Sequence, residues 1–278
     1  MSDPLPQQIV PVLAGGGTRL PAHVGVLTAL ADMGIGYDHI VGVSGGSVVA
    51  SLAAAGKEMD ELKFLLRNVN FAQFRGYSLI GLLKNGGLST GKRFEHWMES
   101  QLGSVCFGDL DKNLHVVAAD VRSGRPVVFN RDNSPDITVA RAVLYSISIP
   151  LIFPFHHYGE HVLVDGSILA EDSLFCDWAG DRTPVVCFRL RDKRLADAHP
   201  ARRVLPVADY MFMLIRTFMN TISREYLSES LWLNTVLIET DGMSPLEFNM
   251  TPEQKQSLFD LGYATTQEFL PAKLARRG

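Results

Sequence analysis

The 278-residue sequence contains 26 lysine and arginine residues and 30 aspartate and glutamate residues, which gives a formal net charge of −4. Hydrophobic residues make up 46% of the chain and charged residues 20%, a balance that excludes an intrinsically disordered protein. The slight acidity argues against a nucleic-acid partner, because proteins that bind nucleic acid usually carry a clear basic excess.

The lack of a recognisable targeting signal and the spacing of the cysteines both predict an intracellular protein. The first ten residues, MSDPLPQQIV, lack a basic region followed by an apolar one, and no run of about 18 apolar residues occurs. The three cysteines, an odd number without paired spacing, argue against a disulfide framework and against a metal site. These features predict a soluble cytoplasmic protein whose membrane contact, if any, is peripheral.

Short apolar runs alternate with helical patterns through the first two thirds of the chain. Residues 9–14 are predicted to form a strand that ends in three glycines, and the following helix has Pro21 in its first turn and ends at Gly34. Residues 39–43 form the next predicted strand and residues 47–55 an apolar helix. Further strands are predicted at 114–119, 162–164 and 185–189. Because these strands are apolar on both faces, we predict an α/β fold whose mostly parallel sheet is covered by helices on both sides.

Two stretches lie outside this alternation. Residues 75–88 contain four glycines and are predicted to form a long mobile connection. Residues 189–203 hold six basic and two acidic residues. The charge pattern of this second stretch is typical of a solvated loop, and contact with anionic lipid headgroups is the alternative.

The sequence Gly42-Val43-Ser44-Gly45-Gly46 is a G-x-S-x-G motif between a predicted strand and a predicted helix. A nucleophile on such a sharp turn has a strained backbone, and side chains two residues to either side would collide, which Gly42 and Gly46 avoid. The start of the helix also places backbone N–H donors and a positive dipole end near the serine hydroxyl. The motif therefore predicts Ser44 as a nucleophile.

A second glycine motif, Gly15-Gly16-Gly17-Thr18-Arg19, also follows a predicted strand. Three consecutive glycines let the backbone approach a ligand and direct N–H groups at one point, where an acyl-transfer enzyme holds the oxyanion. The alternatives are a tight structural turn and a dinucleotide-binding loop. The dinucleotide loop is disfavoured because Leu20 stands where close helix packing requires a small residue. Arg19 would either contact a phosphate or pin the loop.

Asp165-Gly166 directly follows the apolar run 162–164, and the carboxyl end of a buried strand is where α/β folds bind ligands. Burial would raise the basicity of such a carboxylate, although an aspartate before a glycine is also a common turn pair. A conventional triad needs a histidine as well, but of the eight histidines only His199 stands out after Asp165. A Ser–Asp dyad, in which the carboxylate takes the proton directly, is therefore an alternative to the triad.

In order and separation these motifs closely resemble those of patatin-like phospholipases across roughly residues 8 to 190, and the tail around Leu261-Gly262-Tyr263 is also similar. The other stretches that carry the resemblance are Ala22-His23-Val24-Gly25-Val26-Leu27, Ala119-Asp120-Val121-Arg122-Ser123-Gly124, Ser146-Ile147-Ser148-Ile149-Pro150 and Val164-Asp165-Gly166.

The resemblance implies a three-layer α/β/α lipid acyl hydrolase in which Ser44 is the nucleophile and Asp165 the base. The backbone of Gly15, Gly16 and Gly17 would form the oxyanion hole, with the Gly16 and Gly17 N–H groups as the main donors. The supporting residues of the motifs would be Arg19, Gly42, Gly46 and Gly166, and His23 would lie outside the dyad.

The resemblance also implies one domain over residues 1–278, with the motifs in residues 8–190 and a helical part in residues 204–278. The substrate would be a phospholipid or a lysophospholipid, with peripheral membrane contact. No metal and no other cofactor is expected, because side chains and backbone already fill the acid–base and electrostatic roles.

Two departures from the family pattern bear on this hypothesis. Leu20 stands where the family usually has a glycine, which affects the turn into the first helix, and residues 167–173 replace a glycine and an Asn/Pro turn behind the base. The alternatives are a general carboxylesterase, lipase or acyltransferase with the same dyad, and a catalytically weak lipid-binding regulatory protein. Only the altered residues 167–173 favour the regulatory protein.

Overall fold

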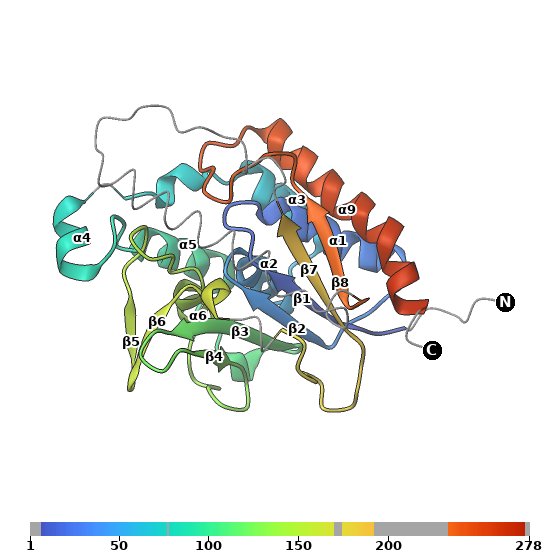
Figure 1. Cartoon of the computed structure of the whole chain (residues 1–278), viewed down its shortest axis with the longest axis horizontal. Helices are drawn as coiled ribbons and strands as arrows, with labels where there is room; N and C mark the ends of the chain where they lie inside the picture. The colour runs from blue at the N-terminus through green and yellow to red at the C-terminus, as the bar shows by residue number, and fades with distance from the viewer. Residues whose placement is uncertain (1–6, 77, 170–173, 192–232, 276–278) are drawn as a thin grey trace.

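The computed structural model describes residues 7–76, 78–169, 174–191 and 233–275. At its centre is an eight-stranded sheet in the order β5-β6-β3-β2-β1-β7-β8, with β4 paired to β3 (Figure 1). The strands are β1 (Val10–Ala14), β2 (His39–Val43), β3 (Asn113–Asp120), β4 (Arg125–Phe129), β5 (His156–Tyr158), β6 (His161–Val164), β7 (Val185–Arg191) and β8 (Thr235–Glu239).

Five neighbouring strands, β3, β2, β1, β7 and β8, run parallel, whereas β4 and β6 are antiparallel to β3, and β5 is antiparallel to β6. Residues of the parallel strands are buried on both faces, as the continuous apolar runs predict. The predicted α/β fold with a mostly parallel sheet flanked by helices is confirmed.

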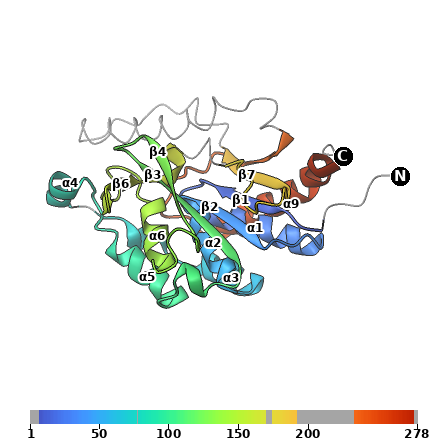
Figure 2. The same ribbon diagram turned by 90° about the horizontal axis from the view of Figure 1, so that it is seen from below.

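Helices α2, α3, α5 and α6 gather along one face of the sheet (Figure 2). The helices are α1 (Leu20–Asp32), α2 (Gly45–Ala54), α3 (Met59–Asn68), α4 (Leu79–Asn85), α5 (Lys92–Leu102), α6 (Val139–Ser146) and α9 (Pro252–Ala275). Short 3-10 helices occupy Phe71–Phe74, Phe107–Asp109 and Gly166–Ile168. On the opposite face a smaller apolar cluster around Val12, Val41 and Cys187 packs against Leu174 and Trp178.

Helix α9 runs along α1 (Figure 1), and two glycines set their close approach. A Cβ atom on Gly25 of α1 would lie 2.1 Å from the Phe259 carbonyl oxygen, and one on Gly262 would lie 2.0 Å from the Ala22 carbonyl oxygen. The glycine in the similar tail motif is therefore a packing residue, and it holds α9 against the helix that follows the glycine triplet.

Two expectations from the sequence need correction. Residues 79–85 of the predicted mobile connection form helix α4, because Ser78 accepts a hydrogen bond from the Gly81 N–H at its start and Gly86 adopts a left-handed conformation at its end. The C-terminal part predicted to be helical from residue 204 also contains β8, which extends the parallel sheet beside β7. Of the basic stretch 189–203, residues 192–203 lie outside the described residues.

Among the helices of the described part of the chain, none combines the length and the apolar character that crossing a membrane requires.

Candidate active site

Ser44 occupies a sharp turn between β2 and α2. Its backbone has φ 52° and ψ −130°, a strained conformation for a residue with a side chain. A Cβ atom on Gly42 would lie 2.4 Å from the Ser47 Cα, and one on Gly46 would lie 2.0 Å from the Leu13 carbonyl oxygen. Both glycines are therefore required by close backbone packing, as the steric argument from the sequence predicts.

The backbone of this turn is held by Ser146, at the end of α6. The Ser146 hydroxyl accepts a hydrogen bond of 2.9 Å from the Ser44 N–H and donates one of 2.6 Å to the Val117 carbonyl oxygen. A single buried hydroxyl thus links the turn to β3. The sequence places Ser146 in a motif of the resemblance but gives no signal of this role.

Ser44 and Asp165 meet across β3 because of strand register. Val117 of β3 pairs with Val43, the last residue of β2, and two positions further on Ala119 pairs with the last residue of β6. Ser44, which follows β2, and Asp165, which follows β6, therefore lie next to each other. The Ser44 hydroxyl donates a hydrogen bond of 2.6 Å to Asp165 Oδ2.

The Asp165 carboxylate is fully buried, with 0% of the residue exposed, and Ser44 is 1% exposed. Its other oxygen, Oδ1, accepts a hydrogen bond of 2.8 Å from the N–H of Ser167, the first residue of the altered segment. Residues 170–173 of that segment lie outside the described residues. Burial raises the pKa of Asp165 from 3.8 to about 6, and the hydrogen bonds from Ser44 and Ser167 oppose that rise only in part. A carboxylate in this setting is a stronger base than an exposed one.

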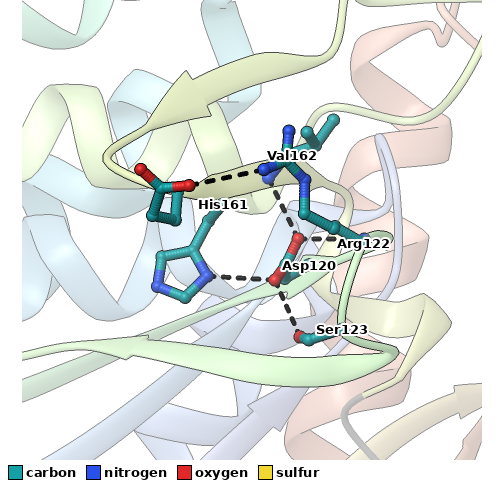
Figure 3. A network of polar contacts seen from close by, with 6 residues as sticks. Asp120, Arg122, Ser123, His161 and Val162 are labelled. Carbon is teal, nitrogen blue, oxygen red and sulfur yellow. Dashed lines mark hydrogen bonds and ion pairs between the residues drawn. The ribbon is translucent and has the colours of Figure 1, made fainter.

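A second buried aspartate, Asp120, fixes the strand that carries Asp165 (Figure 3). It lies at the end of β3 and accepts hydrogen bonds from the Val162 N–H (2.9 Å) and from His161 Nδ1 (3.0 Å), both on β6. It also binds the Arg122 N–H and the Ser123 hydroxyl in the turn to β4. These hydrogen bonds, led by that from His161, hold the pKa of Asp120 well below its usual range. Asp120 is therefore a carboxylate that ties β6 to β3.

The glycine triplet lies beside the dyad, and its backbone groups have different partners. The Gly15 N–H donates to the Val43 carbonyl oxygen (3.1 Å), and the Gly15 carbonyl oxygen accepts from the Gly46 N–H (3.0 Å). Of the three predicted oxyanion donors, Gly15 is therefore already engaged. The N–H groups of Gly16 and Gly17 donate to no partner among the described residues.

Arg19 pins this loop from behind. Its side chain is buried, and it donates from Nε to the Gly16 carbonyl oxygen (3.1 Å) and from a terminal nitrogen to the Thr240 hydroxyl (2.8 Å) just after β8. Both bonds fit the loop-pinning role, one of the two roles considered from the sequence. Leu20 begins α1 directly after Arg19, so the turn into the first helix forms despite the missing glycine.

No histidine of the described residues hydrogen-bonds to Ser44 or to Asp165, and His199 lies outside them. His23 is buried on α1 with Nε2 3.1 Å from the Gly15 carbonyl oxygen. Because a carbonyl only accepts, Nε2 carries the proton. Burial lowers the pKa of His23 to about 4, so its imidazole is neutral at physiological pH and supports the glycine loop.

An apolar pocket opens at Ser44 and contains about 50 Å³ of free volume. Its walls come from five parts of the chain: the glycine loop with the start of α1, Ser44 with the start of α2, the segment from Phe71 to Trp97, the segment after α6, and residues after β8. The lining residues are Gly17, Thr18, Leu20, Ser44, Gly45, Val48, Phe71, Phe74, Phe94, Trp97, Ile147, Ile149, Phe153, Pro245, Leu246 and Phe248. No local signal in the sequence identifies the aromatic members, because they meet only in the folded chain. The described residues contain no group of three or more side chains arranged to hold a metal ion.

Comparison with known proteins gives consistent matches. A family model described as patatin-like phospholipase matches residues 12–172. An uncharacterised protein of Acanthamoeba polyphaga mimivirus is 25% identical over 281 residues, which cover 92% of this chain and 91% of that protein. An uncharacterised NTE family protein of Mycobacterium tuberculosis is 30% identical over 183 residues, which cover 65% of this chain but 30% of that protein.

Among solved structures, VipD from Legionella pneumophila superposes with a TM-score of 0.69 over 96% of this chain and 67% of that chain, at 17% sequence identity. A likeness at this identity shows a shared fold. This chain thus spans nearly the whole mimiviral protein and less than a third of the mycobacterial one.

Proposed function

Because this chain belongs to the patatin-like phospholipase family, we propose that it hydrolyses fatty-acyl esters of phospholipids or lysophospholipids through a Ser44–Asp165 dyad. The observation that carries the proposal is the 2.6 Å hydrogen bond from the Ser44 hydroxyl to the buried Asp165 carboxylate, at the mouth of an apolar pocket. A nucleophile and a base in direct contact are what covalent acyl transfer requires.

In the first step the Ser44 oxygen attacks the ester carbonyl carbon while its proton passes to Asp165 Oδ2. With a pKa of about 6, Asp165 is ionised at neutral pH and still more basic than an ordinary carboxylate. The tetrahedral intermediate then collapses, and the proton moves from Asp165 to the departing alcohol oxygen. In the second step Asp165 takes a proton from water, whose oxygen attacks the acyl-enzyme, and the proton returns to Ser44 as the fatty acid leaves.

The oxyanion of each tetrahedral intermediate would be bound by the N–H groups of Gly16 and Gly17. Both lie in the loop beside Ser44 and donate to no partner among the described residues. They can therefore donate to a substrate without breaking a hydrogen bond to one of these residues. Loss of one such donor raises the barrier by about 3 kcal/mol in well-studied hydrolases. Arg19 would position this loop through its bond to the Gly16 carbonyl.

The composition of the pocket supports a fatty-acyl substrate. The wall beside Ser44 holds four aromatic side chains, Phe71, Phe74, Phe94 and Trp97, and none of the described residues that line the pocket is charged. An acyl chain gains free energy by leaving water for such a surface, at roughly 0.8 kcal/mol per buried CH₂ group. A polar or charged acyl group would instead lose its hydration there.

The test is release of fatty acid from phospholipid vesicles, with a chelator present, by the wild type and by the Ser44→Ala and Asp165→Asn variants. We expect release by the wild type and a loss of at least about a thousandfold in both variants. Ser51→Ala is the matched control, because Ser51 is a buried serine of α2 that bonds only to the Val48 carbonyl oxygen. An unchanged rate for Ser44→Ala would refute the dyad.

The same assay separates the alternatives. Turnover of a soluble short-chain ester without fatty-acid release from vesicles would indicate a general carboxylesterase, and transfer of the acyl group to an added alcohol would indicate an acyltransferase. Absence of turnover with every substrate would favour a lipid-binding regulatory protein that keeps the scaffold.

A further inference from the structure

The two principal walls of the apolar pocket come from chain segments that contain no acidic residue. Residues 62–94 and 137–159 include no aspartate or glutamate, although acidic residues outnumber basic ones in the chain as a whole. The first segment supplies Phe71, Phe74 and Phe94 to the pocket, and the second supplies Ile147, Ile149 and Phe153. The basic residues of the two segments are Lys63, Arg67, Arg75, Lys84, Lys92, Arg93 and Arg141. In a protein of net charge −4, the charged residues of these two wall segments are thus all basic, and of the seven Lys63 is paired with Asp60 and Arg141 with Glu95.

The acidic residue that follows each of these segments forms an ion pair. Glu95, the first acid after residue 94, forms an ion pair of 2.9 Å with Arg141. Glu160, the first acid after residue 159, lies 3.5 Å from Arg122. By contrast, Lys84 and Arg93 are exposed and form no ion pair with a described residue. Their charges are available to an external anion.

Helix α4 lies at one end of the molecule, apart from the other helices (Figures 1 and 2). Leu83 on this helix is 87% exposed, the highest value among the large hydrophobic side chains described. Gly86, just after the helix, lies against the partly exposed ring of Phe155, whose Cδ1 would be 3.0 Å from a Cβ atom on Gly86. We name these residues, Leu83, Lys84, Gly86 and Phe155, the α4 tip.

The α4 tip is attached to the pocket wall by backbone hydrogen bonds. The Leu151 N–H donates to the Gly86 carbonyl oxygen, and the Leu88 N–H donates to the Leu151 carbonyl oxygen. One residue further on, the Ser89 N–H donates to the Ile152 carbonyl oxygen. Residue 151 lies between Ile149 and Phe153 of the pocket lining. A surface that contacts the α4 tip is therefore next to the pocket wall.

From this arrangement we infer that the α4 tip and the basic residues around it dock the protein on the surface of an anionic phospholipid bilayer. The inference rests on the proposed function, since a hydrolase of phospholipids must take its substrate from a bilayer. An exposed leucine flanked by lysine suits the boundary between headgroups and acyl chains, where the apolar part inserts and the cation meets lipid phosphates. The acidic remainder of the molecule would be repelled by the same surface, so the charge distribution also sets the orientation.

The test is flotation with vesicles of phosphatidylcholine, alone or mixed with phosphatidylglycerol, in the Ser44→Ala background so that the lipid is not consumed. We expect tighter binding to the mixed vesicles, weakened by salt. Each cation near such a surface contributes about fivefold in affinity, so Lys84→Gln/Arg93→Gln should weaken binding to mixed vesicles about 25-fold. Leu83→Gln should weaken it about tenfold through the lost insertion of the side chain.

Matched controls come from other faces of the molecule. Phe269→Gln on α9 removes an exposed apolar side chain, 47% exposed, and Arg125→Gln/Arg182→Gln removes two exposed cations. Both controls should bind as the parent does, and an unchanged thermal unfolding midpoint shows that each variant folds.

The outcomes also separate this inference from the proposed function. Equal binding by the α4-tip variants and their controls, or no preference of the parent for anionic vesicles, overturns the docking inference. The expected pattern of binding without any fatty-acid release or soluble-ester turnover by the wild type would support docking and refute the proposed hydrolase activity.

Discussion

The buried Asp165 carboxylate leads to a prediction that concerns stability as well as rate: Asp165→Asn should make the protein more stable at neutral pH while abolishing its activity. An asparagine can keep both contacts, because its oxygen can accept from the Ser167 N–H and its amide can donate to the Ser44 oxygen, in place of bonds that now measure 2.8 and 2.6 Å. The substitution therefore removes a buried charge and keeps both contacts, although the Ser44 O–H loses its carboxylate acceptor, which makes the gain in stability an upper bound.

The magnitude follows from the pKa. An exposed aspartate titrates near 3.8, and in the folded protein the pKa of Asp165 is raised to about 6 by burial. A difference of about two pH units, at about 1.4 kcal/mol per unit, means that the ionised carboxylate destabilises the folded state by about 3 kcal/mol above pH 6. Between pH 4 and pH 6 the folded state binds more protons than the unfolded state, so this destabilisation grows as the pH rises and is absent below about pH 4.

Urea unfolding of the wild type and of Asp165→Asn at a series of pH values measures this difference. We expect the variant to be more stable by up to about 3 kcal/mol at pH 7.5 and the gap to close as the pH falls from about 6 to about 4. In parallel, kcat/KM of the wild type should fall as the pH drops through about 6, because Asp165 becomes protonated. A stability gap that does not change with pH would show that the carboxylate is not the buried charge described, and the reasoning would fail.

Two further substitutions test the packing around the site. Gly46→Ala should destabilise the protein by about 3 kcal/mol or more in urea unfolding, because its Cβ would lie 2.0 Å from the Leu13 carbonyl oxygen. Gly36→Ala is the matched control, because a Cβ there would lie 3.7 Å from its nearest contact, the Gln7 carbonyl oxygen, and equal losses in both would refute the packing argument. Leu20→Ala should shift the ratio of kcat/KM for lauroyl over butyryl esters upward by about tenfold, because Leu20 lines the pocket and would lie 3.0 Å from a Cβ atom on Gly45. An unchanged ratio would mean that Leu20 does not limit the acyl chain.

Local patterns in the sequence predicted the elements that carry the chemistry. The strand at residues 39–43 matches β2, and the apolar helix predicted at 47–55 corresponds to α2, Gly45–Ala54. The requirement for glycine at positions 42 and 46 was also predictable, because it depends on the geometry of one turn. These features depend on residues close together in the chain, so periodicity and turn chemistry suffice to predict them.

Helix α4 shows where local reasoning fails. Its seven residues lie between glycines that suggest a mobile connection, and the cap formed by Ser78 and the left-handed Gly86 outweighs that signal. The strand β8 was likewise missed, because the whole part from residue 204 was predicted to be helical. Its place beside β7 depends on contacts between segments 48 residues apart, such as the ion pair from Arg191 to Glu239.

What the sequence by itself determined is the identity of the fold, the turn that presents Ser44 and the carboxylate at the end of β6. Only the tertiary structure decided three features of the site. The Ser44 and Asp165 oxygens lie 2.6 Å apart, and the Gly15 N–H is already bonded, whereas the N–H groups of Gly16 and Gly17 donate to no described residue. The third feature is the set of aromatic residues that line the pocket. The physical reason is that strand register and side-chain burial depend on segments far apart in the chain. Burial then raises the pKa of Asp165, and the extent of burial cannot be predicted from the residues near it in the sequence.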